Sequence, residues 1–188
     1  PTFEQVAEWK HNTTAIPQQI RILRDIINHI KEETQSTGSN IYWSVENNTI
    51  GESALLVIND FGEENIPGMF VSEPIRKGHI RKFRKGFNTT HRTKISACAR
   101  LKSMVEKGKL KIHSKPFITE LKAFVASGSS YKAKTGETDD LVSSMLLAMR
   151  IVSVLKDWDP KVYTSFSQAD EDTACLLYTS PSPRDLST

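Results

Sequence analysis

The sequence predicts an α/β fold in which a mixed β-sheet carries helices on both faces. Short runs rich in β-branched and aromatic residues alternate with longer amphipathic stretches, a pattern typical of strands alternating with helices. The chain has 188 residues, about the size of one domain with a sizeable core. Hydrophobic residues make up 38% of it and charged residues 25%, which is ordinary for a globular protein and excludes a disordered or fibrous one.

Residues 2–11 are predicted to form the first strand. Apolar and polar residues alternate loosely there, and Phe3 and Trp9 supply apolar surface. A mixed sheet needs a further strand beside this one, and nothing before Phe3 could form it. We therefore expect the polypeptide to be a fragment, whose domain at residues 1–160 lacks its opening strand.

A helix and a buried strand are predicted next. Thr13 or Thr14 is expected to cap the helix, which has Pro17 in its first turn. Its apolar stripe consists of Ile20, Leu23, Ile27 and Ile30. The run Ile41–Val45 is short and rich in β-branched and aromatic residues, which indicates a buried strand parallel to its neighbour. Glu46 then falls at the carboxyl end of this strand.

The middle of the chain predicts another helix and strand, followed by a segment of unusual charge. Asn48 or Thr49 is expected to cap the helix, and Gly62 is expected to end it. The inner face of this helix is expected to hold Ile50, Ala54, Leu55 and Ile58. Met69–Val71 then predicts a short strand. Residues 76–94, here called the basic segment, contain no acidic residue and are predicted to begin as a loop.

Two more helices and a strand are predicted before the last helix. The first of these helices continues through about Glu106, and its inner face is expected to hold Ile95, Leu101 and Val105. Leu110–His113 predicts a strand, Pro116 opens another helix, and residues 127–136 indicate a loop or hairpin. The last helix has apolar positions at helical spacing, namely Leu141, Met145, Ala148, Val152 and Leu155, widened by Val142, Leu146 and Met149.

The chain beyond the last helix breaks this pattern. Residues 161–188 are expected to be a disordered tail, in which residues 176–188 resemble translated sequencing-adapter sequence and are expected to be non-native. The two cysteines, Cys98 and Cys175, lie far apart and have no zinc-like spacing. No apolar run approaches the roughly 18 residues needed to span a bilayer, so a membrane is not an expected partner.

Two adjacent carboxylates, Asp139 and Asp140, stand where a loop turns into the last helix. Taken alone they are explained as a cap, formed by Thr138 or Asp139, because negative charge is favoured at the positive end of a helix dipole. Glu46 has its own rigid position at a strand end, where open α/β sheets bind ligands, although taken alone it is better explained as an exposed acid after a strand. Carboxylates that converge from different elements bind hard divalent cations through oxygen. Glu46 and Asp140 are therefore candidate metal ligands and catalytic residues.

The basic segment is the candidate nucleic-acid contact. Its cations, among which Phe83 and Phe87 are interleaved, could neutralise several phosphates. The candidate DNA-binding residues are Arg76, Lys77, Arg81, Lys82, Arg84, Lys85, Arg92 and Lys94. A solvated loop explains such a charge run equally well. No GxxxxGK[ST] or GxSxG motif occurs, so neither an ATPase nor a nucleophilic hydrolase is indicated.

With a strand-end acid, a basic segment and an Asp-Asp helix in this order, the sequence resembles the C-terminal nuclease domain of the large terminase subunit of tailed bacteriophages. The resemblance covers most of residues 2–157. The segments that carry it are Ile41–Gly51, Arg92–Lys94, Leu110–His113 and Glu137–Val142. Each segment alone is a weak signal, and their order makes the combination specific.

The resemblance implies an RNase H-like fold that cuts double-stranded concatemeric DNA with Mg²⁺ or Mn²⁺ during genome packaging. It implies that Glu46 and Asp140 are metal-binding catalytic acids and that Asp139 is an accessory neighbour. The implied partners are double-stranded DNA, the portal protein and the small terminase subunit, in the host cytoplasm. The family's first catalytic aspartate lies on a strand that would precede Pro1, so this chain is expected to cleave poorly. The family pattern commonly has His where Thr138 stands, so no role of that histidine is carried over.

Two other functions fit the same residues. Another RNase H-like nuclease, of the resolvase or integrase type, would share the acids. A non-catalytic DNA-binding module would need only the basic segment and would bind DNA in a salt-sensitive way without metal.

Overall fold

The structure is a computed structural model, and it describes residues 2–77 and 80–156. The predictions for residues 161–188 lie outside the described residues. Within the described part, the helices are α1 (Ile16–Glu33), α2 (Thr49–Phe61), α3 (His91–Glu106), α4 (Lys115–Ala123) and α5 (Asp140–Leu155), with a 3-10 turn at Glu63–Asn65. The strands there are β1 (Phe3–Glu4), β2 (Tyr42–Trp43), β3 (Met69–Phe70), β4 (Glu73–Lys77), β5 (Ile80–Arg84), β6 (Leu110–Lys111), β7 (Phe124–Ser127) and β8 (Ser130–Ala133).

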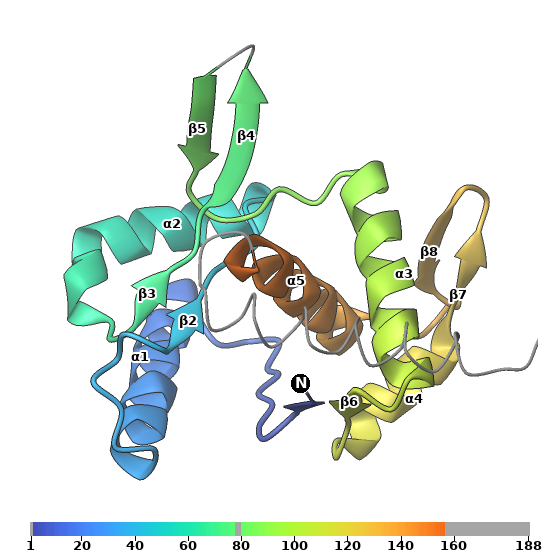
Figure 1. The fold of residues 1–188 in the computed structure, drawn as a ribbon, viewed down its shortest axis with the longest axis horizontal. Helices are drawn as coiled ribbons and strands as arrows, with labels where there is room; N and C mark the ends of the chain where they lie inside the picture. Colours follow the sequence, from blue (N-terminus) through green and yellow to red (C-terminus); the bar gives the residue numbers. More distant parts are fainter. Residues whose placement is uncertain (1, 78–79, 157–188) are drawn as a thin grey trace, which may run out of the picture.

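The strands pair in both directions, so the predicted mixed α/β architecture is confirmed. β1 is parallel to β6, and β2 is parallel to β3. The hairpins β4–β5 and β7–β8 are antiparallel. Within the described residues each pair is a separate two-stranded sheet. The β2–β3 pair lies beside α1 and α2, whereas the β1–β6 pair lies beside α4 (Figure 1).

Helix α5 lies at the centre of the molecule and packs against both groups of elements (Figure 1). On one side it shares a core with α3, β6 and α4, made of Ala97, Leu101, Met104, Leu110, Phe117, Val142, Leu146 and Met149. A second core between α1, α2 and β2 consists of Ile20, Ile27, Trp43, Ile58 and Ile66. A third cluster of Val71, Phe87, Val154 and Leu155 fixes the last turns of α5 to the strands. Because both ends of α5 are buried, its first turn is a rigid support.

Several element boundaries follow the sequence signals. Pro17 and Pro116 lie in the first turns of α1 and α4, Gly62 ends α2, and residues 127–136 form most of a hairpin. The predicted caps Thr13 and Thr14 are wrong, because α1 follows Ala15 without a side-chain cap. The Thr14 hydroxyl lies 2.6 Å from Nδ1 of His11 and is therefore used elsewhere.

The predicted strand over residues 2–11 is wrong beyond its start. Only Phe3–Glu4 pairs with β6, and the Val6 side chain is 83% exposed. The chain then leaves the sheet and crosses to the start of α5, where Lys10 pairs with Asp140. Loose alternation of apolar and polar residues does not distinguish such an extended connection from a strand. The predicted strand Ile41–Val45 is likewise shortened to β2.

The basic segment begins as the β4–β5 hairpin, and the predicted loop is wrong. The register pairs Arg76 with Arg81 and Ile75 with Lys82. A run of like charges in a sequence disfavours strand pairing, so the sequence favoured a loop here. The hairpin projects from the rest of the molecule (Figure 1).

Some inward-facing predictions are also wrong. Ile50 is 75% exposed because the first turn of α2 borders an open groove, and Val105 is 43% exposed near the end of α3. The buried face of α5 is centred on Val142, Leu146 and Met149, so the stripe is rotated from the predicted one. In the described part of the chain, every helix is too short or too polar to cross a membrane.

Candidate functional site

Glu46 and Asp140, far apart in the sequence, line one groove. The groove has a volume of about 720 Å³ and is bordered by α1, the segment after β2, and the first turns of α2 and α5. Other side chains that line it include Trp9, Ile20, Leu23, Ser144 and Leu147. The two acids that the sequence singled out as metal ligands therefore share one surface.

The backbone of Glu46 is held from two sides. Phe87 forms a parallel bridge with it, in which the Phe87 N–H donates to the Val45 carbonyl at 3.0 Å. The Asn47 N–H donates to the Phe87 carbonyl at 2.8 Å. On the other side, α2 approaches so closely that a Cβ on Gly51 would overlap the Glu46 carbonyl oxygen. Only glycine fits there, so the position of Glu46 depends on backbone contact.

The Glu46 side chain is half-buried. Among the described residues its carboxylate has no hydrogen-bond or ion-pair partner. Burying a carboxylate without a partner costs free energy, and a bound cation would offset that cost. An unpaired carboxylate at a groove fits the predicted role of metal ligand.

Asp140 is the first residue of α5, and its side chain is 63% exposed. Its Oδ2 atom lies 2.9 Å from Nζ of Lys10, so a cation already neutralises this carboxylate. Asp139 is the N-cap residue, as predicted, but makes no side-chain cap bond. Oδ2 of Asp139 lies 3.7 Å from Nζ of Lys94 on α3, and Asp139 does not line the groove. The two adjacent acids therefore have different partners.

Glu120 on α4 caps the start of α5 from outside the helix, and sequence reasoning missed it. It is 7% exposed and is the buried charged residue of the described chain. Its Oε2 atom accepts the N–H groups of Leu141 and Val142 at 2.8 and 3.3 Å. Its Oε1 atom accepts from the Thr138 hydroxyl at 2.9 Å and from Lys10 at 2.7 Å. Four donors converge on one carboxylate, which holds the first turn of α5 in place.

The charges in this network reinforce one another. Burial opposes ionisation of Glu120, but the hydrogen bonds from Lys10, Thr138 and the two amides outweigh it, so the pKa of this carboxyl lies below its ordinary value of 4.5. The hydrogen bonds to Glu120 and then Asp140 raise the pKa of Lys10. Glu120 is therefore an anion and Lys10 a cation at neutral pH.

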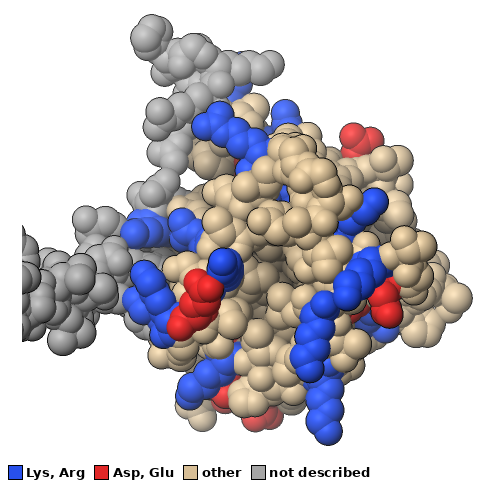
Figure 2. Space-filling view, turned by 90° about the vertical axis from the view of Figure 1, so that its right-hand side faces the viewer, with Lys and Arg blue, Asp and Glu red and all other residues tan. Residues whose placement is uncertain are grey.

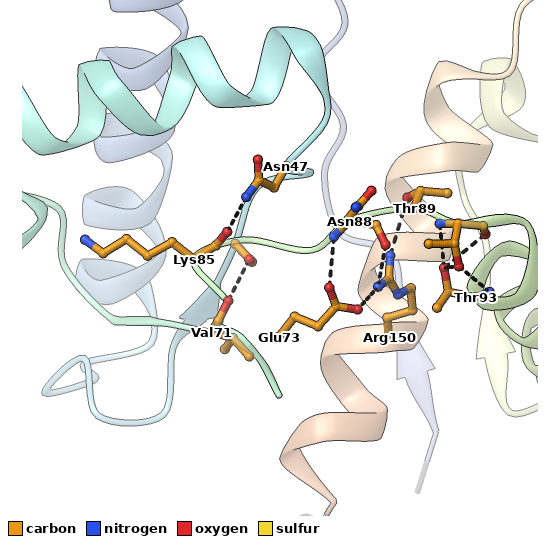
Figure 3. A network of polar contacts seen from close by, with 10 residues as sticks. Asn47, Val71, Glu73, Lys85, Asn88, Thr89, Thr93 and Arg150 are labelled. Carbon is orange, nitrogen blue, oxygen red and sulfur yellow. Dashed lines mark hydrogen bonds and ion pairs between the residues drawn. The ribbon is translucent and has the colours of Figure 1, made fainter. Parts of the chain in front are cut away.

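Arg150, three turns along α5, ties this helix to the base of the hairpin (Figure 3). Its guanidinium donates to Oε1 of Glu73 at 2.5 Å and to the Asn88 carbonyl at 3.1 Å, and it lies 5.0 Å from the centre of the Phe87 ring. Oε2 of Glu73 in turn accepts from the Asn88 N–H at 3.1 Å. Both charged side chains are largely buried, at 11% and 16% exposure. Since Phe87 also bridges Glu46, Arg150 connects the supports of both acids.

The candidate DNA-binding residues differ in whether an acidic side chain neutralises them. Arg76 and Lys77 lie on β4, and Arg81, Lys82 and Arg84 lie on β5. Lys82, Arg84 and Arg92 are exposed and have no acidic partner in the part of the chain that is described. By contrast, Lys85 pairs with Glu63 at 2.8 Å, and Lys94 pairs with Asp139. The cations with no acidic partner are the better candidates for phosphate contacts.

The face of α3 and the β7–β8 hairpin carries a second, different surface. A broad uncharged area there is bordered by Lys and Arg side chains (Figure 2). An apolar groove of about 520 Å³ lies between α3, α4 and this hairpin, and Cys98, Leu101, Ile118 and Tyr131 line it. This groove contains none of the predicted site residues.

The donor set is suited to a hard divalent cation but is small. Carboxylate oxygen atoms are the ligands that Mg²⁺ and Mn²⁺ prefer. Within residues 2–77 and 80–156, no cluster of three or more His, Cys, Asp or Glu side chains could hold a metal ion. Glu46 and Asp140 are the two carboxylates that line the groove, so they are the residues that would hold such an ion.

Comparison with known protein families gives an independent result. A family model that describes the terminase RNaseH-like domain matches residues 2–150. The match covers both acids, the basic segment and all but the last turns of α5.

Proposed function

Because the chain belongs to the terminase RNaseH-like domain family, we propose that it is a divalent-metal-dependent endodeoxyribonuclease domain that cuts double-stranded concatemeric DNA. The observation that supports the metal-dependent part is the shared groove, which is lined by both Glu46, whose carboxylate is unpaired in the described chain, and Asp140, from a distant part of the chain. Mg²⁺ or Mn²⁺ bound there would activate water and stabilise the leaving oxygen of a phosphodiester.

The chain's own residues would hold the reacting groups. Gly51 and Phe87 fix the backbone of Glu46, and Glu120 fixes the turn that carries Asp140. β5 leads through Gly86 to Phe87, so the hairpin base adjoins the segment of Glu46. A duplex bound by the cations of the hairpin would thus have its phosphates near the groove.

The setting of this activity follows from the family. We propose that the domain works in the host cytoplasm as part of the DNA-packaging machinery of a tailed bacteriophage. Its partners there would be the portal protein and the small terminase subunit, in addition to the DNA.

The test is nicking of supercoiled plasmid by this chain in Mn²⁺. With two carboxylates we expect slow cleavage that Asp140→Asn and Glu46→Gln each reduce at least about tenfold. Glu137→Gln is the matched control, since Glu137 is exposed beside the site and its removal should leave the rate unchanged. A rate that Asp140→Asn does not alter would contradict the assignment.

The same experiment separates the alternatives. A resolvase-type nuclease would prefer a four-way junction over linear duplex. A non-catalytic module would bind duplex with a steep salt dependence, without cleavage and without any effect of the acid substitutions.

A further inference from the structure

The Lys10 ammonium group contacts three oxygen atoms at the start of α5. Its Nζ atom lies 2.7 Å from Oε1 of Glu120, 2.7 Å from the Thr138 hydroxyl and 2.9 Å from Oδ2 of Asp140. An ammonium group has three donors, and here all three have partners. Lys10 comes from the irregular segment between β1 and α1, so it reaches this position from outside α4 and α5.

We propose that Lys10 is a positioning residue that competes with the divalent cation for Asp140. This inference rests on the proposed function, because it takes Asp140 to be a metal ligand. Lys10 neutralises Asp140 while no metal is bound and must release that carboxylate when the ion binds. The affinity of the site for metal is therefore lower than its carboxylates alone would give.

Little of the Lys10 network has to change for Asp140 to be released. Only the contact to Asp140 has to break, while the contacts to the buried Glu120 and to Thr138 can persist. Lys10 then stays beside the groove, and the start of α5 keeps its support from Glu120. Since Asp140 is 63% exposed, its pair with Lys10 is weak enough for a divalent ion to replace.

Two other charged side chains near the groove are paired with residues other than Asp140. Asp139, the adjacent acid, is paired with Lys94 on α3 and lies outside the groove lining. Arg150, which lines a neighbouring pocket with Glu46, is paired with Glu73 and not with Asp140. Lys10 is thus the cation paired with Asp140 in the described chain.

The test is the Kd for Mn²⁺, which is measured from the electron paramagnetic resonance signal of the ion that stays free. Lys10→Met should lower the Kd for Mn²⁺ about three- to tenfold, because the competing charge is gone. Lys10→Arg, which keeps the charge, should stay within about twofold of wild type. Lys102→Met is the control for loss of a lysine, since Lys102 is 75% exposed and far from the groove lining.

A second pair of variants separates the two proposals. In an Asp140→Asn background, Lys10→Met should no longer tighten Mn²⁺ binding. If the Asp140→Asn variant binds Mn²⁺ with the same Kd as the wild type, the proposed metal site is wrong. If Asp140→Asn weakens binding but Lys10→Met does not tighten it, the metal site stands and the competition is wrong.

A measurement on the unsubstituted chain covers the case in which Lys10→Met does not fold. Titration of ¹⁵N-labelled protein with Mg²⁺ should shift the Lys10 side-chain amine signal as the ion saturates. Saturation without such a shift would overturn the proposal.

Discussion

The two acids of the groove are supported in opposite ways. Asp140 begins a helix whose first turn is buried at Val142 and receives two amide bonds at Glu120, and its carboxylate is already paired with Lys10. Glu46 follows a strand of two residues and is held by backbone contacts alone, with a carboxylate that has no partner in the described chain.

This difference shows that the two acids reach one groove through different kinds of support. The start of the helix that carries Asp140 is supported by Glu120, independently of the pair that Asp140 forms with Lys10. Glu46 has no hydrogen-bond or ion-pair partner among the described residues, and close backbone contacts with Gly51 and Phe87 hold its segment in place. Substitutions at Gly51, Arg150 and Glu120 would each remove one of these supports.

The largest effect is expected at Gly51, which supports Glu46. Gly51→Ala would place a methyl group onto the Glu46 carbonyl oxygen, so α2 or the Glu46 segment must move. We expect a loss of roughly 4 kcal/mol in the free energy of unfolding, measured by urea denaturation.

Gly108→Ala is the matched control. Gly108 has a φ of +62°, but nothing lies within 4 Å of the added Cβ. This variant should lose only about 1 kcal/mol, from the left-handed backbone conformation. Equal losses in the two variants would show that the contact with Glu46 is not what requires glycine.

A smaller effect is expected at Arg150, which connects the two supports. Arg150→Met leaves Glu73 buried and without its cation, so we expect about 3 kcal/mol of destabilisation. Lys102→Met, at an exposed pair with Glu106, should cost less than about 0.5 kcal/mol. Adding Glu73→Gln to Arg150→Met should restore part of the loss, and a double variant as unstable as the sum of its parts would argue against the pair.

The smallest effect concerns Glu120, which supports Asp140, and it depends on pH. Because the folded pKa lies below 4.5, the ionised carboxylate stabilises the fold above that pH, and this stability is lost as the pH falls through the folded pKa. Glu120→Gln should therefore destabilise by about 1.5 kcal/mol at neutral pH and by less at about pH 3. A difference that does not change between the two pH values would mean that the charge of Glu120 is not used.

The sequence pointed to two acids that line one groove, but not to the residues that support them. Local patterns were enough for the start of the last helix at Asp139–Asp140 and for the helices marked by Pro17 and Gly62, because each signal lies within a few residues. The family resemblance that these segments predicted is confirmed by the match over residues 2–150.

What could not be predicted depends on contacts between distant segments. Glu120 lies in a helix where an acid ordinarily faces solvent, and only the approach of α5 makes it a buried cap. Lys10 lies in a stretch that alternates like a strand, yet its ion pairs draw the chain away from the sheet. The β4–β5 hairpin was missed because a run of like charges in the sequence favours a loop over paired strands.

The central claim is that Glu46 and Asp140 hold one divalent ion together, and calorimetric titration with Mn²⁺ tests it most directly. If they share the ion, Glu46→Gln and Asp140→Asn should each weaken binding about tenfold or more, and the double variant should be little worse than either single one. Glu137→Gln should bind as wild type does. Binding that either single substitution leaves unchanged would contradict the account.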